Sequence, residues 1–156
     1  MSSGACILAH FADQEKLVSA AAKLSADKSI TRWDAVDGHV QLVAWSPNSA
    51  LARESIARLD GVDQVTALEI TPPIVPAQLD HSQCFAYVFI EIDKSKTATV
   101  STALAGIPEV VSSSPARGGC DLVALVGAET FSRVDRVIRE QIRPLDGVLR
   151  LKQNRI

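Results

Sequence analysis

The sequence contains two short landmarks, and each of them occurs twice in the same order. The first is the stretch 38–44 (Gly-His-Val-Gln-Leu-Val-Ala), which matches 118–124 (Gly-Gly-Cys-Asp-Leu-Val-Ala). The second is Leu-Asp-Gly-Val, which occurs at 59–62 and again at 145–148. The interval between the landmarks is six residues longer in the second copy. Placed in a helix, six residues would lengthen it by ~9 Å. The duplication predicts two copies of one folding unit.

Hydrophobic periodicity gives both halves the same order of elements, β-α-β-β-α-β. Strands are predicted where apolar residues alternate or form short runs, and helices where they recur at a spacing of three to four residues. Asp37-Gly38 and Gly118-Gly119 mark hairpins between the two middle strands. In the first half the predicted strands are 5–10, 30–36, 39–45 and 62–71, and the helices are 13–25 and 49–59. In the second half the predicted strands are 85–92, 110–114, 120–126 and 147–152, and the helices are 96–104 and 130–143.

This order is that of the ferredoxin-like split βαβ unit, so the predicted fold class is α+β. We expect two tandem ferredoxin-like units, at 1–71 and 84–156, joined by a linker at 72–83 that carries three prolines. Helices cover only one face of each antiparallel sheet, and a unit of about 70 residues is only marginally stable alone. We therefore expect the sheets to pack face to face, as in the dimeric α+β barrel type.

Composition excludes several classes of protein. The chain has 156 residues, 47% of them hydrophobic, and a net charge of −2, so no basic footprint for nucleic acid is present. No run of eighteen apolar residues indicates a membrane span, and the first residues do not resemble a secretory signal. Three widely spaced cysteines form neither a disulfide framework nor a CxxC metal site. These features predict a cytoplasmic protein with reduced thiols.

Residues 85–156 resemble the effector-binding domain of Lrp/AsnC regulators, also called the RAM domain. The resemblance rests on order and spacing along about half of the chain, and the family's loop motif is Gly-x-aromatic-Asp. Gly118 and Asp121 match this motif, and Cys120 replaces the aromatic residue. The resembling segments are 86–90 (Ala-Tyr-Val-Phe-Ile), 107–110 (Ile-Pro-Glu-Val), 118–122 (Gly-Gly-Cys-Asp-Leu) and 131–148, a helix followed by Asp-Gly-Val.

The resemblance implies a function. In the family, RAM domains pair through their sheets, and small effectors, often amino acids, bind at subunit interfaces near this loop. The family's N-terminal helix-turn-helix has no counterpart here, because residues 1–70 are predicted to form a degenerate second copy, with Gln41 where Asp121 sits. The implied protein is a stand-alone ligand-sensing module of transcription regulation. It would be a homo-oligomer with a possible protein partner, and without direct DNA binding or membrane association.

Four loop residues form the candidate binding site: Arg117, Gly118, Gly119 and Asp121. An arginine fork can hold a ligand carboxylate through two parallel hydrogen bonds, and the aspartate can hold an ammonium group. The backbone amides of the two glycines could add donors. Together these groups suit a zwitterionic amino acid. The structural alternative is an acid that bonds nearby backbone amides and an arginine that makes a surface ion pair.

No catalytic or metal-binding residues are predicted. The three histidines have no partner at helical spacing and no neighbouring cysteine pattern. Cys120 is predicted to be a small buried hydrophobe, not a nucleophile, because no Cys/His pair is visible. We therefore predict a binding module without a cofactor, not an enzyme.

Two other function classes stay open. Residues 36–43 and Gly61-Val62 are similar to the NapD-type chaperones, which bind a twin-arginine signal peptide on the same fold. A chaperone or adaptor would add a peptide strand to an exposed sheet edge. A small monooxygenase of the dimeric α/β-barrel type fits the architecture, but no acid/base or metal constellation supports it.

Overall fold

The computed structural model describes residues 4–70, residue 79 and residues 83–156. The chain divides into two compact units, Met1–Val75 with Ala116–Gly119, and Pro76–Pro115 with Cys120–Ile156. The predicted linker, 72–83, lies outside the described residues except at positions 79 and 83.

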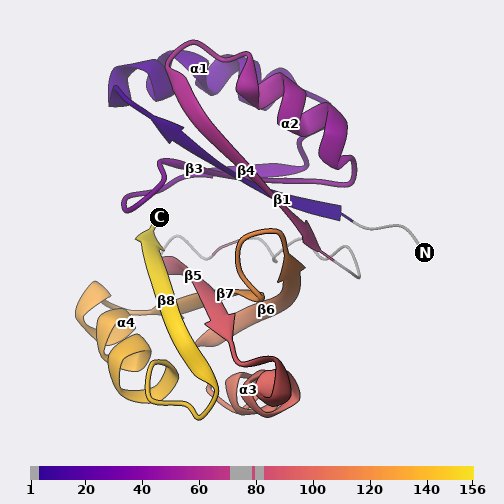
Figure 1. The fold of residues 1–156 in the computed structure, drawn as a ribbon. Coiled ribbons are helices and arrows are strands. Elements are labelled where there is room, and N and C mark those ends of the chain that lie inside the picture. Colours follow the sequence, from indigo (N-terminus) through magenta and orange to yellow (C-terminus); the bar gives the residue numbers. More distant parts are fainter. Residues whose placement is uncertain (1–3, 71–78, 80–82) are drawn as a thin grey trace. The chain divides into compact units, whose positions relative to one another are not determined.

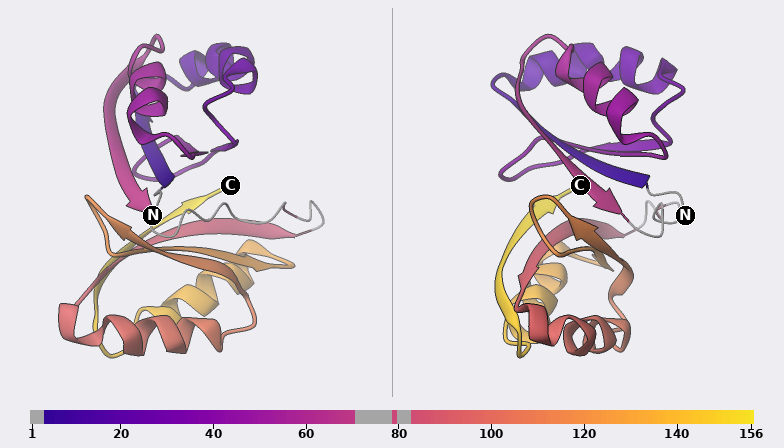
Figure 2. Two further views of the ribbon diagram at one scale, coloured as in Figure 1. Left: turned by 90° about the vertical axis from the view of Figure 1, so that its right-hand side faces the viewer. Right: turned by 45° about the vertical axis from the view of Figure 1, so that its right-hand side comes forward.

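The first unit has the predicted β-α-β-β-α-β order. Its sheet is antiparallel, with strand order β2-β3-β1-β4, and both helices cover the same face of it (Figure 2). Residues 4–70 therefore form a ferredoxin-like unit and contain no helix-turn-helix. The elements are β1 (Gly4–Phe11), α1 (Gln14–Ala26), β2 (Arg32–Ala35), β3 (Leu42–Ser46), α2 (Ser49–Ala57) and β4 (Val62–Ile70), and all except β2 are labelled in Figure 1.

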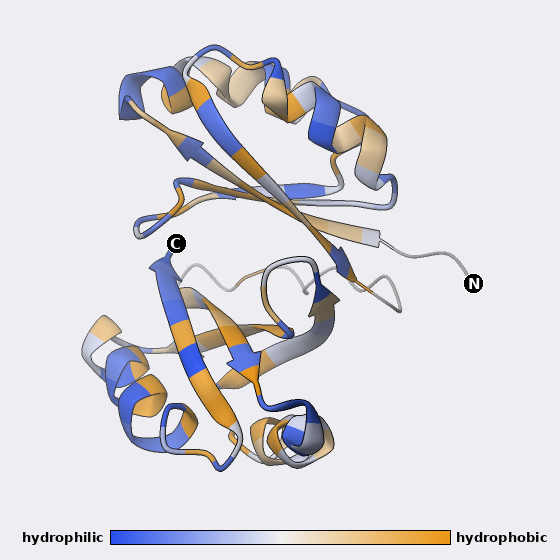
Figure 3. Cartoon of the chain, in the orientation of Figure 1, coloured by the Kyte–Doolittle hydropathy of each residue, from blue (hydrophilic) through white to orange (hydrophobic). Residues whose placement is uncertain are grey.

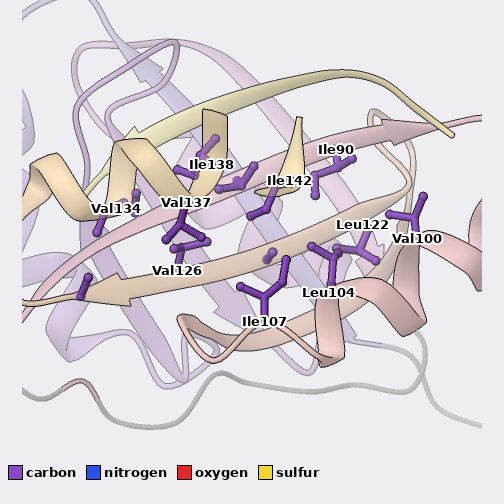
Figure 4. Packing of buried hydrophobic residues seen from close by; sticks show 14 of the residues in the cluster. Ile90, Val100, Leu104, Ile107, Leu122, Val126, Val134, Val137, Ile138 and Ile142 are labelled. Atoms are coloured by element: carbon purple, nitrogen blue, oxygen red, sulfur yellow. The ribbon is translucent and has the colours of Figure 1, made fainter. Parts of the chain in front are cut away.

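The second unit repeats this order. Its antiparallel strands run β6-β7-β5-β8. Alternate residues of β5, from Ala86 to Ile92, face the helices and join the core drawn in Figure 4. The elements are β5 (Cys84–Ile92), the 3₁₀ turn η1 (Lys94–Lys96), α3 (Thr97–Ala105), β6 (Val110–Arg117), β7 (Leu122–Ala128), α4 (Phe131–Val137), η2 (Ile138–Ile142) and β8 (Val148–Arg155).

Polar side chains start the helices in both units. An oxygen of each capping side chain accepts a backbone N–H that the first turn leaves unpaired. Asp13 accepts from Glu15 N at 2.9 Å and Asn48 from Leu51 N at 3.1 Å. In the second unit Asp93 accepts from Ser95 N at 3.0 Å, and Thr130 accepts from Arg133 N at 3.1 Å. The caps fall at equivalent places in the two copies.

The six extra residues of the second copy do not all lengthen its second helix. Part of the insertion extends a strand, because β7 has 7 residues and β3 has 5. The rest follows α4, where the helix widens into the π-helical stretch η2 of 5 residues. In η2 the N–H of Arg143 donates to the carbonyl of Ile138, five residues earlier, at 2.8 Å. Such π-helical turns accommodate an insertion within a helix and are frequent at functional sites.

Both Leu-Asp-Gly-Val landmarks hold the turn into the last strand of their unit. Gly61 and Gly147 have φ angles of +91° and +105°, which side-chain-bearing residues rarely adopt. A lysine stem covers each glycine, so a Cβ atom on Gly61 would lie 2.4 Å from Lys16 Cβ. Lys16 Nζ reaches Asp60 Oδ2 at 2.8 Å, and Lys96 Nζ reaches Asp146 Oδ2 at 2.9 Å. We call each set, Lys16–Asp60–Gly61 and Lys96–Asp146–Gly147, a lysine-covered turn.

Replacing either turn glycine is predicted to destabilise the protein. Gly61→Ala and Gly147→Ala each force a left-handed backbone and a contact with the lysine stem, costing about 1–3 kcal/mol. Gly106→Ala is the matched control, because Gly106 has φ −87° and its added Cβ would meet only Ala103 O at 3.5 Å. Urea denaturation followed by circular dichroism measures the difference. Equal stability of all three variants would contradict the prediction.

Candidate functional site

Asp121 lies immediately before β7, and its carboxylate extends the contact with β5 beyond Ile90–Leu122, the last residue pair of the two strands. A bulge between Glu91 and Ile92 shifts the register of β5 against β8. The N–H of Ile92 donates to Asp121 Oδ2 at 2.8 Å, and the N–H of Asp121 donates to Ile90 O at 2.9 Å. Asp121 therefore pairs with the end of β5 through both backbone and side chain.

Gln41 makes the same pair of contacts in the first unit. A bulge between His10 and Phe11 shifts the register of β1 against β4. The N–H of Phe11 donates to Gln41 Oε1 at 2.8 Å, and the N–H of Gln41 donates to Ala9 O at 3.0 Å. The sequence match between Gln41 and Asp121 is thus a structural equivalence: each position must supply a hydrogen-bond acceptor.

The glycine pair before Asp121 is explained by backbone conformation and by close packing. Gly118 has φ +105°, and a Cβ placed on it would lie 3.0 Å from Ala67 O. A Cβ on Gly119 would lie 3.1 Å from Leu68 Cδ2. Both glycines are exposed and are grouped with the first unit, whereas Asp121 belongs to the second. Their exposure leaves the backbone of this loop accessible.

Arg117 is the last residue of β6, and its side chain is exposed. Among the residues that the structure describes, no ion pair involves its guanidinium group. The half-buried carboxylate of Asp121 accepts the backbone N–H of Ile92, as in the structural alternative of an acid that bonds a backbone amide.

Cys120 is buried, as the sequence predicted. Burial raises the pKa of its thiol to about 11, and the S–H group donates to Leu122 O at 3.6 Å. The thiol is therefore protonated at neutral pH. A protonated, buried thiol is a poor nucleophile, since the thiolate is the reactive form.

Metal ligands do not gather anywhere in the described ranges, where no group of three His, Cys, Asp or Glu residues could hold an ion. His10 Nδ1 lies 2.6 Å from Asp63 Oδ1 on the surface of the first unit, and His81 falls outside the described residues. No helix in residues 4–70 or 83–156 is long and apolar enough to cross a membrane.

Sequence reasoning missed one group of residues. Arg139, Arg143 and Arg155 line a cavity in the second unit together with Asp135 and Gln153. The residues come from the end of the last helix and from β8, so no local motif joins them. An excess of arginine on the helix 130–143 was the only available signal.

Comparison with known proteins places residues 85–155 in the family described as the Lrp/AsnC ligand binding domain. No curated protein matches the chain. A solved structure from Thermus thermophilus is 29% identical, over 47% of this chain and 91% of that chain, with a TM-score of 0.45.

Two solved structures resemble nearly the whole chain. The siroheme decarboxylase NirDL is 10% identical, over 98% of this chain and 70% of that chain, with a TM-score of 0.74. A putative monooxygenase from Lactobacillus acidophilus NCFM is 8% identical, over 99% of this chain and 93% of that chain, with a TM-score of 0.61. At these identities the likeness is one of fold alone. It confirms the predicted fold class, tandem ferredoxin-like units of the dimeric α+β barrel type.

The family match confirms the Lrp/AsnC resemblance predicted from the sequence: residues 85–155 are a ligand-binding domain of this type. The likeness of the first half to NapD-type chaperones stays a prediction.

The shared role of Gln41 and Asp121 predicts matched losses of stability. Asp121→Ala and Gln41→Ala each leave a strand amide without its acceptor, which costs about 1–3 kcal/mol. Asp121→Asn keeps an oxygen acceptor and is expected to cost less than Asp121→Ala. Urea denaturation of the three variants compares their free energies of unfolding. A loss in Asp121→Asn as large as in Asp121→Ala would show that the charge itself stabilises the fold.

The raised pKa of Cys120 predicts low reactivity and a definite pH dependence. At pH 7.5 a thiol-specific reagent should label half-buried Cys84 faster than Cys120, as measured by peptide mass spectrometry. Between the ordinary thiol pKa of 9.0 and about 11, the folded protein keeps a proton that the unfolded chain loses. Cys120 therefore lowers stability as pH rises through this window. Labelling of Cys120 as fast as that of Cys84 would contradict its protonated, buried state.

Proposed function

We propose that the chain is a small-molecule-binding module, and that the loop from Arg117 to Asp121 holds a zwitterionic amino acid. One observation carries the proposal. The fold needs only an acceptor at this position, because Gln41 fills the equivalent role with a neutral amide. Asp121 fills it with a carboxylate. The contact with the backbone does not require the negative charge of Asp121, whereas binding of a ligand ammonium group does.

The loop supplies the complementary charge through Arg117. An exposed guanidinium group with five donors suits a carboxylate, which it holds through two parallel hydrogen bonds. One carboxylate oxygen of Asp121 accepts the N–H of Ile92. A carboxylate can accept more than one hydrogen bond, so Asp121 can also accept from a ligand. The exposed backbone at Gly118 and Gly119 lets a ligand approach closely. An amino acid would thus be recognised at both of its charged ends.

The assignment to a ligand-binding domain supports sensing in place of catalysis. The buried, protonated Cys120 is the nearest nucleophilic atom in sequence, and burial disfavours its reactive form. In our proposal the module is a cytoplasmic homo-oligomer that changes its assembly or a protein contact when the effector binds. It does not bind DNA by itself, since residues 4–70 form a ferredoxin-like unit.

Thermal shift with a panel of amino acids tests the proposal directly. A binding amino acid should raise the melting temperature in a saturable way. Its N-acetyl derivative lacks the ammonium group that would meet Asp121. Its methyl ester lacks the carboxylate that would meet Arg117. Both derivatives are expected to bind roughly tenfold to a hundredfold more weakly, the range for a lost charge-assisted hydrogen bond.

Two variants assign the contacts. Asp121→Asn should lose ligand-induced stabilisation while the free protein stays folded, and Arg117→Gln should do the same. Gln41→Ala is the matched control: it loses the equivalent strand contact in the first unit but should keep the ligand response. The proposal fails if no amino acid stabilises the protein, or if Asp121→Asn and Arg117→Gln respond as the unmodified chain does. Stabilisation by a twin-arginine peptide alone would favour the chaperone alternative.

A further inference from the structure

A cavity of about 320 Å³ opens in the second unit, where the end of the last helix meets β8. Half of the six lining residues are arginines. The C-terminal half of β8 is hydrophilic (Figure 3). The lining residues are Asp135, Ile138, Arg139, Arg143, Gln153 and Arg155.

The single carboxylate in the cavity is already neutralised. Gln153 Nε2 donates to Asp135 Oδ1 at 2.7 Å, and Arg155 Nη2 donates to Asp135 Oδ2 at 2.7 Å. The guanidinium of Arg155 also lies 4.8 Å from the centre of the Phe131 ring, a cation–π distance. These contacts hold Arg155 in place, and they leave Asp135 little capacity to repel an anion.

Two further arginines contribute positive charge that no carboxylate within the cavity lining compensates. In the described part of the chain, Arg143 makes no ion pair. Arg139 has a single long one, 3.9 Å from its Nη2 to Glu140 Oε1 on the exposed surface. An exposed pair at this distance contributes little. The cavity therefore carries an excess of about two positive charges.

The fold does not demand this charge, as comparison with the first unit shows. Val62 pairs with Phe11 at the start of β4 as Val148 pairs with Ile92 at the start of β8, which aligns the two strands. In this register Gln153 corresponds to Ala67, and Arg155 corresponds to Glu69. The π-helical stretch that carries Arg139 also has no counterpart after α2. The basic cavity is therefore specific to the second unit.

We propose that this cavity binds a small dianion through its oxyanion groups. The volume lies within the range of small-ligand sites. Guanidinium forks match the oxygens of phosphate and of carboxylate, and both geometries allow two parallel hydrogen bonds. A phosphate monoester and a dicarboxylate share this chemistry. The site uses none of the residues of the Arg117–Asp121 loop, so it is independent of the function proposed above.

Titration with inorganic phosphate and with succinate tests this site in the full chain. Calorimetry and thermal shift are run in an amine buffer, with sodium chloride keeping the ionic strength constant. We expect saturable binding of at least one of the two anions. The Arg139→Gln/Arg143→Gln double variant should bind it at least tenfold more weakly, because two charge-assisted contacts are lost. The tighter of the two probes identifies the class of ligand.

Control variants keep the test specific. Arg136→Gln removes one arginine from the same helix but not from the cavity lining, so it should bind as the unmodified chain does. Arg117→Gln should also leave anion binding unchanged. The proposal is overturned if neither anion binds, if sodium chloride alone gives the same stabilisation, or if the double variant binds as tightly as Arg136→Gln.

Discussion

In each unit the first strand extends two residues beyond its last pair with the third strand, and the amide at that end still needs an acceptor. An unpaired amide in a folded protein costs about 1–3 kcal/mol, a large part of the stability of a small unit. Both units solve the problem with one side chain just before the third strand: Gln41 accepts from Phe11, and Asp121 accepts from Ile92. The requirement is for an acceptor atom at a fixed place. The side chain can be neutral or charged, and the two copies differ in this respect: Gln41 is a neutral amide and Asp121 is a carboxylate.

The lysine-covered turns impose the second shared constraint, where the chain returns from the second helix to the last strand. A hydrogen bond from Lys16 lowers the pKa of Asp60, and the same bond raises the pKa of the lysine. Both groups are exposed, so the ion pair itself adds little stability. The lysine stem matters more, because it packs over the glycine and leaves no space for a Cβ atom. The lysine stem can take this position only because the residue beneath it is glycine.

Local sequence patterns predicted the structural features that depend on residues close together in the sequence. Periodicity and the repeated landmarks predicted the order of elements, both hairpins and a ferredoxin-like unit in place of a helix-turn-helix in residues 4–70. Contacts between distant residues were missed: Lys16 and Lys96 carry no motif, and their aspartates lie 44 and 50 residues away. The sequence allowed Asp121 to bond a backbone amide but did not identify which one, because the amide of Ile92 lies 29 residues away. The basic cavity depends on how β8 lies against a π-helical stretch, which an amphipathic pattern does not distinguish from a regular helix.

The duplication makes the first unit an internal reference for the second. Where both copies share a feature, such as the caps, the acceptors before the third strand and the lysine-covered turns, the fold is a sufficient explanation. Where the two copies differ, the shared fold does not explain the difference. Two differences stand out: a carboxylate replaces an amide at Asp121, and Gln153 and Arg155 stand where the first unit has Ala67 and Glu69. Both lie within the unit that matches a ligand-binding family. Neither change is required for backbone pairing, so these are the two places where variants of the second unit separate a contribution to the fold from the ligand binding that we propose.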